Sequence, residues 1–249
     1  DVENNAADAF ALSGQAFTDD LADWAKIAPH LYLWDYTTNF SNYLQPFPNW
    51  HVIGENLRLF RRLGVEGVLE QGSYAPGKAS AFAPLRIYLL SKLLWNADAD
   101  TDGLIRAFVR GYYGAEAETG VLQCLSLMEN AASQTHMGIY DMPDAAYLDE
   151  GLIEQADGCL ADALSLTADP LRRERLERER LSFAYVRLAR LPMDAPGRSE
   201  RIDAFAGELA RLGVTELFER RELAGSIQCM KESRCARRRE NVPYGCYRL

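Results

Sequence analysis

The sequence predicts an α/β portion followed by an all-α portion, and two observations support this fold class. Residues 31–36 and 65–69 are short runs of apolar, aromatic and β-branched residues, as in buried strands, and helical periodicity separates and flanks them. Beyond Asp98, apolar residues recur at helical spacing and no run has convincing strand character. Strands that alternate with helices pair in parallel. We therefore expect a parallel sheet or a barrel in the first portion and a helical bundle in the second.

The composition excludes some classes of protein. Of the 249 residues, 48% are hydrophobic and 25% are charged, which is ordinary for a globular protein. The formal net charge of -9 argues against nucleic acid as the main partner, because phosphate binding needs a basic face. No apolar run approaches a membrane span, and no signal peptide is visible. Because the chain opens on Asp1 and not on Met, we expect a mature form, an excised domain or a fragment.

Cysteines, histidines and glycines indicate neither a metal nor a cofactor. The five cysteines are widely spaced without a C-x-x-C pair, namely Cys124, Cys159, Cys229, Cys235 and Cys246. This spacing predicts neither a disulfide framework nor a zinc site, and we expect mostly buried thiols. The three histidines form no H-E-x-x-H pattern. Gly111, Gly114 and Gly120 follow no predicted strand and therefore do not indicate a dinucleotide-binding loop.

The first β/α unit ends in an unusually long polar loop. Residues 1–15 show little periodicity and predict a loop, and Thr18 caps a short helix that ends before Pro29. The strand 31–36 follows, and then residues 37–49, rich in Asn, Ser, Tyr and Pro. A connection of this length is usually functional or a lid. Its aromatic residues could line a cleft or simply pack the loop down, and the sequence leaves both open: Tyr43, Phe47 and Trp50.

The second unit and the helical portion follow in order. A helix capped by Asn49 and ended by Gly64 leads into the strand 65–69, a second polar loop and a helix up to Trp95. Further helices are predicted over residues 102–113, 115–135, 149–166, 170–191 and 199–212. We expect Trp95, Tyr112 and Tyr113 in the core between the two portions, the charged run 172–180 on a solvated helix face, and no clear element in the tail around residues 237–245.

Several segments together resemble a known family. They are residues 33–40 (LWDYTTNF), 46–49 (PFPN), 64–72 (GVEGVLEQG), 85–95 (LRIYLLSKLLW) and 111–114 (GYYG). In this order they resemble the family of the domain of unknown function numbered 4838, whose members include glycoside hydrolase family 163, and the resemblance covers most of residues 18–115. The family is similar to α-glucuronidases and β-hexosaminidases, in which helices follow a (β/α)8 barrel.

The resemblance implies that only part of the enzyme is present. Residues 1–95 would be the C-terminal portion of a (β/α)8 barrel, with its seventh and eighth strands, and residues 96–249 an α-helical domain. The catalytic residues stay unknown and are expected upstream of Asp1, in the missing N-terminal half of the barrel. The implied function is glycan hydrolysis of the β-N-acetylglucosaminidase or α-glucuronidase type, as in polysaccharide degradation, in an extracytoplasmic location, with this portion alone inactive. The alternative is a non-catalytic carbohydrate-binding or scaffold protein.

On that resemblance the strand ends would hold a sugar. Active sites of such barrels lie at the carboxyl ends of the strands. Aromatic side chains suit the apolar face of a sugar, and carboxylates and amides suit its hydroxyl groups. The substrate-binding candidates are Trp34, Asp35, Tyr36, Asn39, Glu70, Gln71 and Tyr74. Asp35 and Glu70 are also a formal acid/base pair, although binding is the role we favour. In the alternative both residues have a structural role only: Asp35 caps a turn and Glu70 pairs with an arginine.

Overall fold

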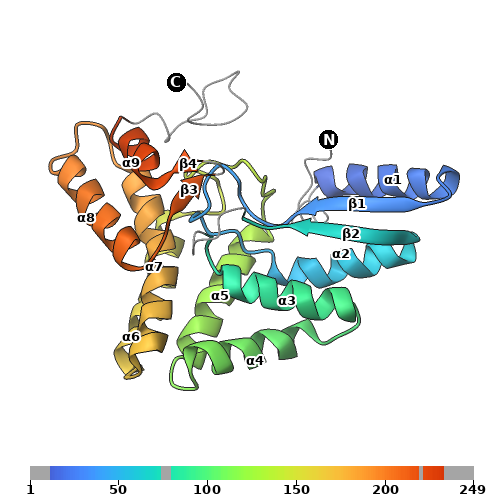
Figure 1. Cartoon of the computed structure of the whole chain (residues 1–249), viewed down its shortest axis with the longest axis horizontal. Coiled ribbons are helices and arrows are strands. Elements are labelled where there is room, and N and C mark those ends of the chain that lie inside the picture. The colour runs from blue at the N-terminus through green and yellow to red at the C-terminus, as the bar shows by residue number, and fades with distance from the viewer. Residues whose placement is uncertain (1–11, 74–79, 219–220, 233–249) are drawn as a thin grey trace.

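Two parallel strands lie at one end of a mostly helical molecule (Figure 1). The computed structural model describes residues 12–73, 80–218 and 221–232. Strand β1 (Leu31–Tyr36) pairs in parallel with β2 (Val65–Gln71), and the register places Trp34 opposite Leu69 and Asp35 opposite Glu70. Within the described residues this sheet has two strands.

The predicted alternation of helices and strands is confirmed. The elements of the first portion are α1 (Leu12–Ile27), β1, α2 (Trp50–Arg62), β2 and α3 (Ala83–Trp95). The second portion begins with the helices α4 (Thr101–Tyr113), α5 (Glu118–Ala132), α6 (Glu150–Leu166), α7 (Pro170–Arg190) and α8 (Arg198–Arg211). Thus α/β structure is followed by helices, as predicted. No helix among the described residues is long and apolar enough to cross a membrane.

The end of the chain differs from the prediction. A small antiparallel hairpin of β3 (Glu216–Phe218) and β4 (Arg221–Glu222) precedes α9 (Leu223–Lys231), so the expectation of no strand beyond Asp98 is wrong. Strands of three and two residues are too short to show a period-two pattern. The predicted tail around residues 237–245 lies outside the described residues.

The start of the first helix and the state of one cysteine also differ from the prediction. Helix α1 begins at Leu12, inside the predicted loop. Cys124 and Cys159 are free thiols, but Cys229 is disulfide-bonded, so the expectation of a buried thiol is wrong for this residue. Sequence spacing could not reveal this bond, because it depends on which residues the fold brings together.

The long loop after β1 is part of the hydrophobic core. Its aromatic residues Tyr43, Phe47 and Trp50 are fully buried. The backbone of the loop bonds to the second portion, since Phe40 N donates to Ile139 O at 2.8 Å and Tyr43 N donates to Leu217 O at 2.9 Å. The lid interpretation is therefore wrong, and the packing alternative is confirmed. The buried cluster includes residues of both portions of the chain.

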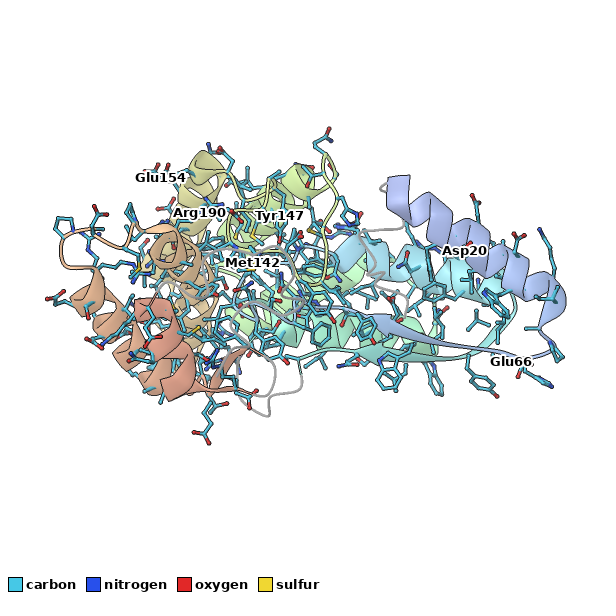
Figure 2. All side chains as sticks on the ribbon, turned by 90° about the horizontal axis from the view of Figure 1, so that it is seen from above. Asp20, Glu66, Met142, Tyr147, Glu154 and Arg190 are labelled. Carbon is cyan, nitrogen blue, oxygen red and sulfur yellow. The ribbon has the colours of Figure 1, made fainter. Side chains whose placement is uncertain are left out.

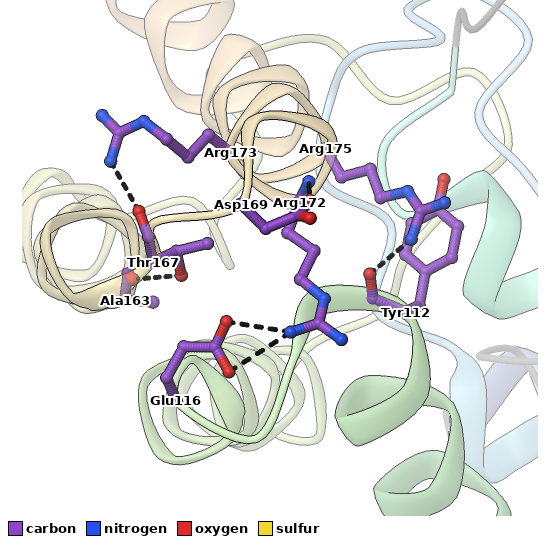
Figure 3. Close-up of polar contacts among 8 residues, drawn as sticks. All are labelled: Tyr112, Glu116, Ala163, Thr167, Asp169, Arg172, Arg173 and Arg175. Carbon is purple, nitrogen blue, oxygen red and sulfur yellow. Dashed lines mark hydrogen bonds and ion pairs between the residues drawn. The ribbon is translucent and has the colours of Figure 1, made fainter.

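Arginines of the charged run at the start of α7 bond to the ends of neighbouring helices (Figure 3). Arg173 Nη1 donates to the carbonyl oxygens of Leu164 and Thr167, both at 2.8 Å, and so satisfies the carboxyl end of α6. Arg175 Nη1 donates to Tyr112 O at 2.6 Å, and its guanidinium lies 3.9 Å from the centre of the Tyr112 ring. The prediction of a solvated helix face is wrong, because long arginine side chains reach carbonyl groups of neighbouring helices.

The three aromatic residues expected between the two portions do not share one environment. Tyr113 is fully buried and Tyr112 is half-buried, as the core prediction requires. Trp95, at the end of α3, is 92% exposed, so the prediction is wrong for this residue. Trp95 is the last residue of α3, which packs on α2 and α4, and helical spacing alone does not show whether a side chain at the end of a helix reaches such a contact.

Candidate functional site: the carboxyl ends of the two parallel strands

One face of the two strands is bare and aromatic. Successive side chains of a strand point to opposite faces, and paired residues of parallel strands share a face. Tyr32, Trp34 and Tyr36 therefore lie on one face with Leu69 and Gln71. Tyr32 is 74% exposed and Trp34 is 56% exposed. In the view of Figure 2, α1, which carries Asp20, lies on one side of the strands, and side chains project from the other side.

Trp34 is held in place on this face. Its Nε1 donates a hydrogen bond to Gln71 Oε1 at 2.7 Å, which fixes the plane of the indole ring. The aromatic row continues along the strand, with 6.5 Å between the ring centres of Trp34 and Tyr36 and 5.5 Å between those of Tyr36 and Phe40. An oriented indole with a free face and an amide at its edge is a suitable platform for a ring that is apolar on one side.

Gly67 allows the row to begin at Tyr32. A Cβ added at Gly67 would lie 2.7 Å from Cδ1 of Tyr32, so a larger residue would displace the tyrosine ring. The Tyr32 ring thus lies directly on the neighbouring strand. Together with Trp34 and Leu69, these residues line an open groove of about 410 Å³.

Asp35 and Glu70 lie on the opposite face, turned toward α2. They are partners in the strand register, on the same face as Leu33 and Val68, which pack on the core. Asp35 is 5% exposed and accepts a hydrogen bond from Tyr36 N at 2.8 Å, and its carboxyl group also contacts Glu70 and the Asn56 amide of α2. The pair therefore lies between the sheet and the helix, behind the aromatic face.

The surroundings of this pair keep it protonated. Burial raises the pKa of Asp35 to about 7, although hydrogen bonds from Tyr36 N, Glu70 and Asn56 lower it. Burial, followed by the charge and the hydrogen bond of the neighbouring Asp35, raises the pKa of Glu70 to about 9. Two carboxyl groups in contact cannot both ionise readily. At neutral pH the pair holds at least one proton, which can serve the hydrogen bond between them.

The remaining candidates differ in their position. Asn39 is fully buried, its Nδ2 donates to Asp141 O at 2.8 Å, and its Oδ1 accepts from Asn42 N at 2.8 Å. Asn39 therefore braces the loop and does not reach the bare face. Tyr74 lies outside the described residues. Of the seven candidates, the structure brings Trp34, Tyr36 and Gln71 together on one face.

A second ionic cluster, which sequence reasoning missed, lies away from the strands. His51, at the start of α2, bonds through Nδ1 to Glu129 and through Nε2 to Asp102 Oδ1 at 2.5 Å. The hydrogen bond with Glu129 is the main cause that raises the pKa of His51 to about 9, with further contributions from Asp102. Residues so far apart in sequence give no local signal. Among the described residues no group of histidine, cysteine and acidic side chains is suited to hold a metal ion.

Comparison with known proteins places the chain in a family. A family model described as a domain of unknown function (DUF4838) matches residues 1–125, or 125 of the 249 residues. The chain belongs to the DUF4838 family. The DUF4838 match covers both parallel strands and α1 to α4, and so includes the whole aromatic face. No curated protein and no solved structure matches the sequence.

Proposed function

We propose that this DUF4838 chain contributes the sugar-binding rim of a glycoside hydrolase, and that β1 and β2 are neighbouring strands of a (β/α)8 barrel. The observation that carries the proposal is the half-exposed Trp34 indole, held by Gln71 at the carboxyl ends of two parallel strands. Carboxyl strand ends are where α/β barrels bind substrates.

The chemistry of the face suits a pyranose ring. The C–H groups of the sugar would stack on Trp34, while the Gln71 amide and the Tyr36 hydroxyl would bind its hydroxyl groups. Asp35 and Glu70 would hold the strand ends from behind. Glycoside hydrolysis normally uses two carboxyl groups that flank the scissile bond. Since Asp35 and Glu70 face α2, we assign neither of them to that role, and we propose that the catalytic acids come from other strands.

The exposed sheet supports a larger barrel. Parallel sheets are normally covered on both faces, and a strand edge with unpaired N–H and C=O groups tends to pair. Further strands on both edges would satisfy those groups and turn the aromatic face inward, toward the centre of the barrel. The disulfide at Cys229 supports our proposal of an extracytoplasmic location, because disulfides persist mainly in oxidising compartments.

The alternative is a non-catalytic carbohydrate-binding or scaffold protein. It is favoured by the composition of the bare face, because the side chains that β1 and β2 present at its carboxyl end are Trp34, Tyr36, Leu69 and Gln71, without a carboxylate. This alternative shares the platform of the first proposal and differs in the fate of the glycan: the sugar would bind and be released intact.

Substitution of Trp34 tests both proposals. In the complete protein, Trp34→Ala should weaken binding of N-glycans or uronic-acid oligosaccharides at least tenfold, as expected for the loss of about 1.4 kcal/mol or more of stacking. Trp24→Ala is the matched control, because Trp24 of α1 is 59% exposed and lies outside the aromatic row. Calorimetric titration measures binding, and chromatography of the glycans separates hydrolysis from simple binding. Equal affinities of wild type and Trp34→Ala for the whole panel would refute the sugar site.

A further inference from the structure

Glu179 is a buried carboxyl group that connects the helical portion to the loops at the strand ends. It lies on α7, it is 3% exposed, and its Oε2 accepts a hydrogen bond from Phe82 N at 2.8 Å. Its Oε1 accepts a hydrogen bond from Tyr113 OH, also at 2.8 Å. Burial of a carboxyl group costs free energy unless hydrogen bonds satisfy its oxygen atoms, and here both oxygen atoms accept one.

The residue that Glu179 holds has an unusual backbone. Phe82, immediately before α3, has a φ of +50° and a ψ of 29°, in the left-handed region. Among the described residues it is the one non-glycine residue with a positive φ. A bulky side chain rarely adopts this conformation, and it persists only where the surroundings enforce it. The hydrogen bond from Phe82 N to Glu179 and the packing of the Phe82 ring on Trp50, with ring centres 5.5 Å apart, provide that enforcement.

Arg86 of α3 joins the same turn to the loop after β1. Its guanidinium is buried, and it donates to Ser80 Oγ at 3.2 Å and to Ala81 O at 3.3 Å on one side. On the other side it donates to Asn49 Oδ1 at 3.1 Å and to Phe47 O at 2.9 Å. One cation therefore ties together the two segments that follow β1 and precede α3.

Further contacts carry this connection to the aromatic face. Ser80 Oγ and Thr38 Oγ1 are hydrogen-bonded at 3.0 Å, and Ala81 N donates to Tyr43 O at 3.1 Å. Beside Thr38, Thr37 N donates to Gln71 O at 2.9 Å, which extends the ladder between the strands. Thr37 thus holds the backbone of Gln71, and the side chain of Gln71 accepts the hydrogen bond from Trp34 through Oε1. An unbroken series of contacts thus links Glu179 with the residue that orients the indole.

We propose that Glu179 is a positioning residue, through which α7 sets the strand-end segments 37–49 and 80–82 and thereby the orientation of Gln71 and Trp34. Its effect on a sugar rests on the proposed function, whereas its effect on the two segments does not. Helix α7 is not a passive attachment to the β/α portion in this proposal.

Hydrogen exchange of the complete protein, read by mass spectrometry, tests the positioning. In Glu179→Ala, peptides that cover residues 37–49 and 80–86 should exchange about tenfold faster, as expected for the loss of a buried charged acceptor, while α8 keeps its rate. Asp157→Ala is the matched control, because Asp157 is also buried and accepts from Arg180 Nε at 2.6 Å and Arg187 Nη1 at 2.8 Å, within α6 and α7 alone. It should leave both segments unchanged relative to α8.

A conservative variant and a glycan probe complete the test. Glu179→Gln keeps an acceptor for Phe82 N but loses the charge, so exchange should rise in the two segments alone, by about twofold to threefold over wild type. If the alanine variant does not fold, that small and local increase carries the test. Uniformly faster exchange along the chain, or the same local pattern in Asp157→Ala, overturns the proposal. With the N-glycan panel, Glu179→Ala should raise KM or Kd about tenfold and change kcat little. Local exchange without any effect of Trp34→Ala on glycans would retain the role of Glu179 and refute the sugar site.

Discussion

Glu70→Gln is the sharpest test of the proton shared behind the aromatic face. Both folded-state pKa values of the pair are raised, to about 7 for Asp35 and about 9 for Glu70. In the unfolded chain both groups have lost their protons by about pH 5. The folded state then binds more protons than the unfolded state, so stability is fully present below the unfolded pKa values and falls as the pH rises through the folded ones.

The size of the effect follows from the number of protons retained. One proton held from pH 5 to pH 7 corresponds to a loss of about 3 kcal/mol in the free energy of unfolding, at about 1.4 kcal/mol per pH unit. Glu70→Gln removes the group that has the higher pKa of the pair, about 9, and its amide can donate to the Asp35 carboxylate as Glu70 does. The loss of stability between pH 5 and pH 7 should therefore shrink by about 3 kcal/mol, the contribution of the Glu70 proton, while the contribution of Asp35 remains.

Urea denaturation of the complete protein at pH 5, 6 and 7 measures this slope. Glu66→Gln is the control, because Glu66 is on the same strand and pairs with the exposed His30 at 2.9 Å, so its variant should keep the wild-type slope. If Glu70→Gln and wild type lose the same stability between pH 5 and pH 7, no proton is shared between Asp35 and Glu70, and our account of the pair is wrong.

Two further predictions concern stability. His51→Gln removes the stabilisation that protonated His51 gains from Glu129 and Asp102. At pH 6 the variant should be about 1 kcal/mol less stable than wild type, after allowance for solvent screening of this half-exposed group. The difference should vanish toward pH 10, because a histidine with a raised pKa contributes its full stabilisation below about pH 6.5 and loses it as the pH rises through about 9. Thermal unfolding at both pH values measures it, and a constant difference would contradict it. Tyr43→Ala should cost about 3–5 kcal/mol, because the ring is fully buried, whereas a lid residue would leave the melting temperature unchanged.

The sequence predicted the order of elements well, because long helices and short strands repeat their patterns locally. Helix α2 was predicted from Asn49 to Gly64 and runs over Trp50–Arg62, and β1 has the predicted bounds. The loop 37–49 was harder to interpret. Its length suggested a functional loop or a lid, but its polar residues are buried and bonded to distant partners such as Asp141 and Ile139, more than 90 residues away in the chain. The composition of the loop does not show which distant residues it will contact.

The candidate site was predicted in part. The sequence analysis assigns three consecutive residues, Trp34, Asp35 and Tyr36, to one site. The period of two in a strand places Asp35 on the other face, and this could have been inferred from the sequence alone. No sequence pattern shows that Asn56 of α2 forms a hydrogen bond with Asp35, or that Glu70 lies opposite Asp35 in the strand register.

The separation of the two faces makes the two roles considered for Asp35 and Glu70 distinguishable by substitution. If these carboxyl groups bound sugar hydroxyls, Glu70→Gln would weaken glycan binding as strongly as Trp34→Ala. If they support the strands from behind, Glu70→Gln alters the pH dependence of stability and leaves glycan affinity within about threefold, because neutral glutamine still hydrogen-bonds Asp35 and the backbone that carries Gln71 is unchanged. Trp34→Ala should show the reverse pattern, with lost affinity and an unchanged pH dependence, since its ring is half-exposed and contacts no ionisable group of the pair. Neighbouring positions on one strand thus serve opposite faces, and the two substitutions separate sugar contact from support.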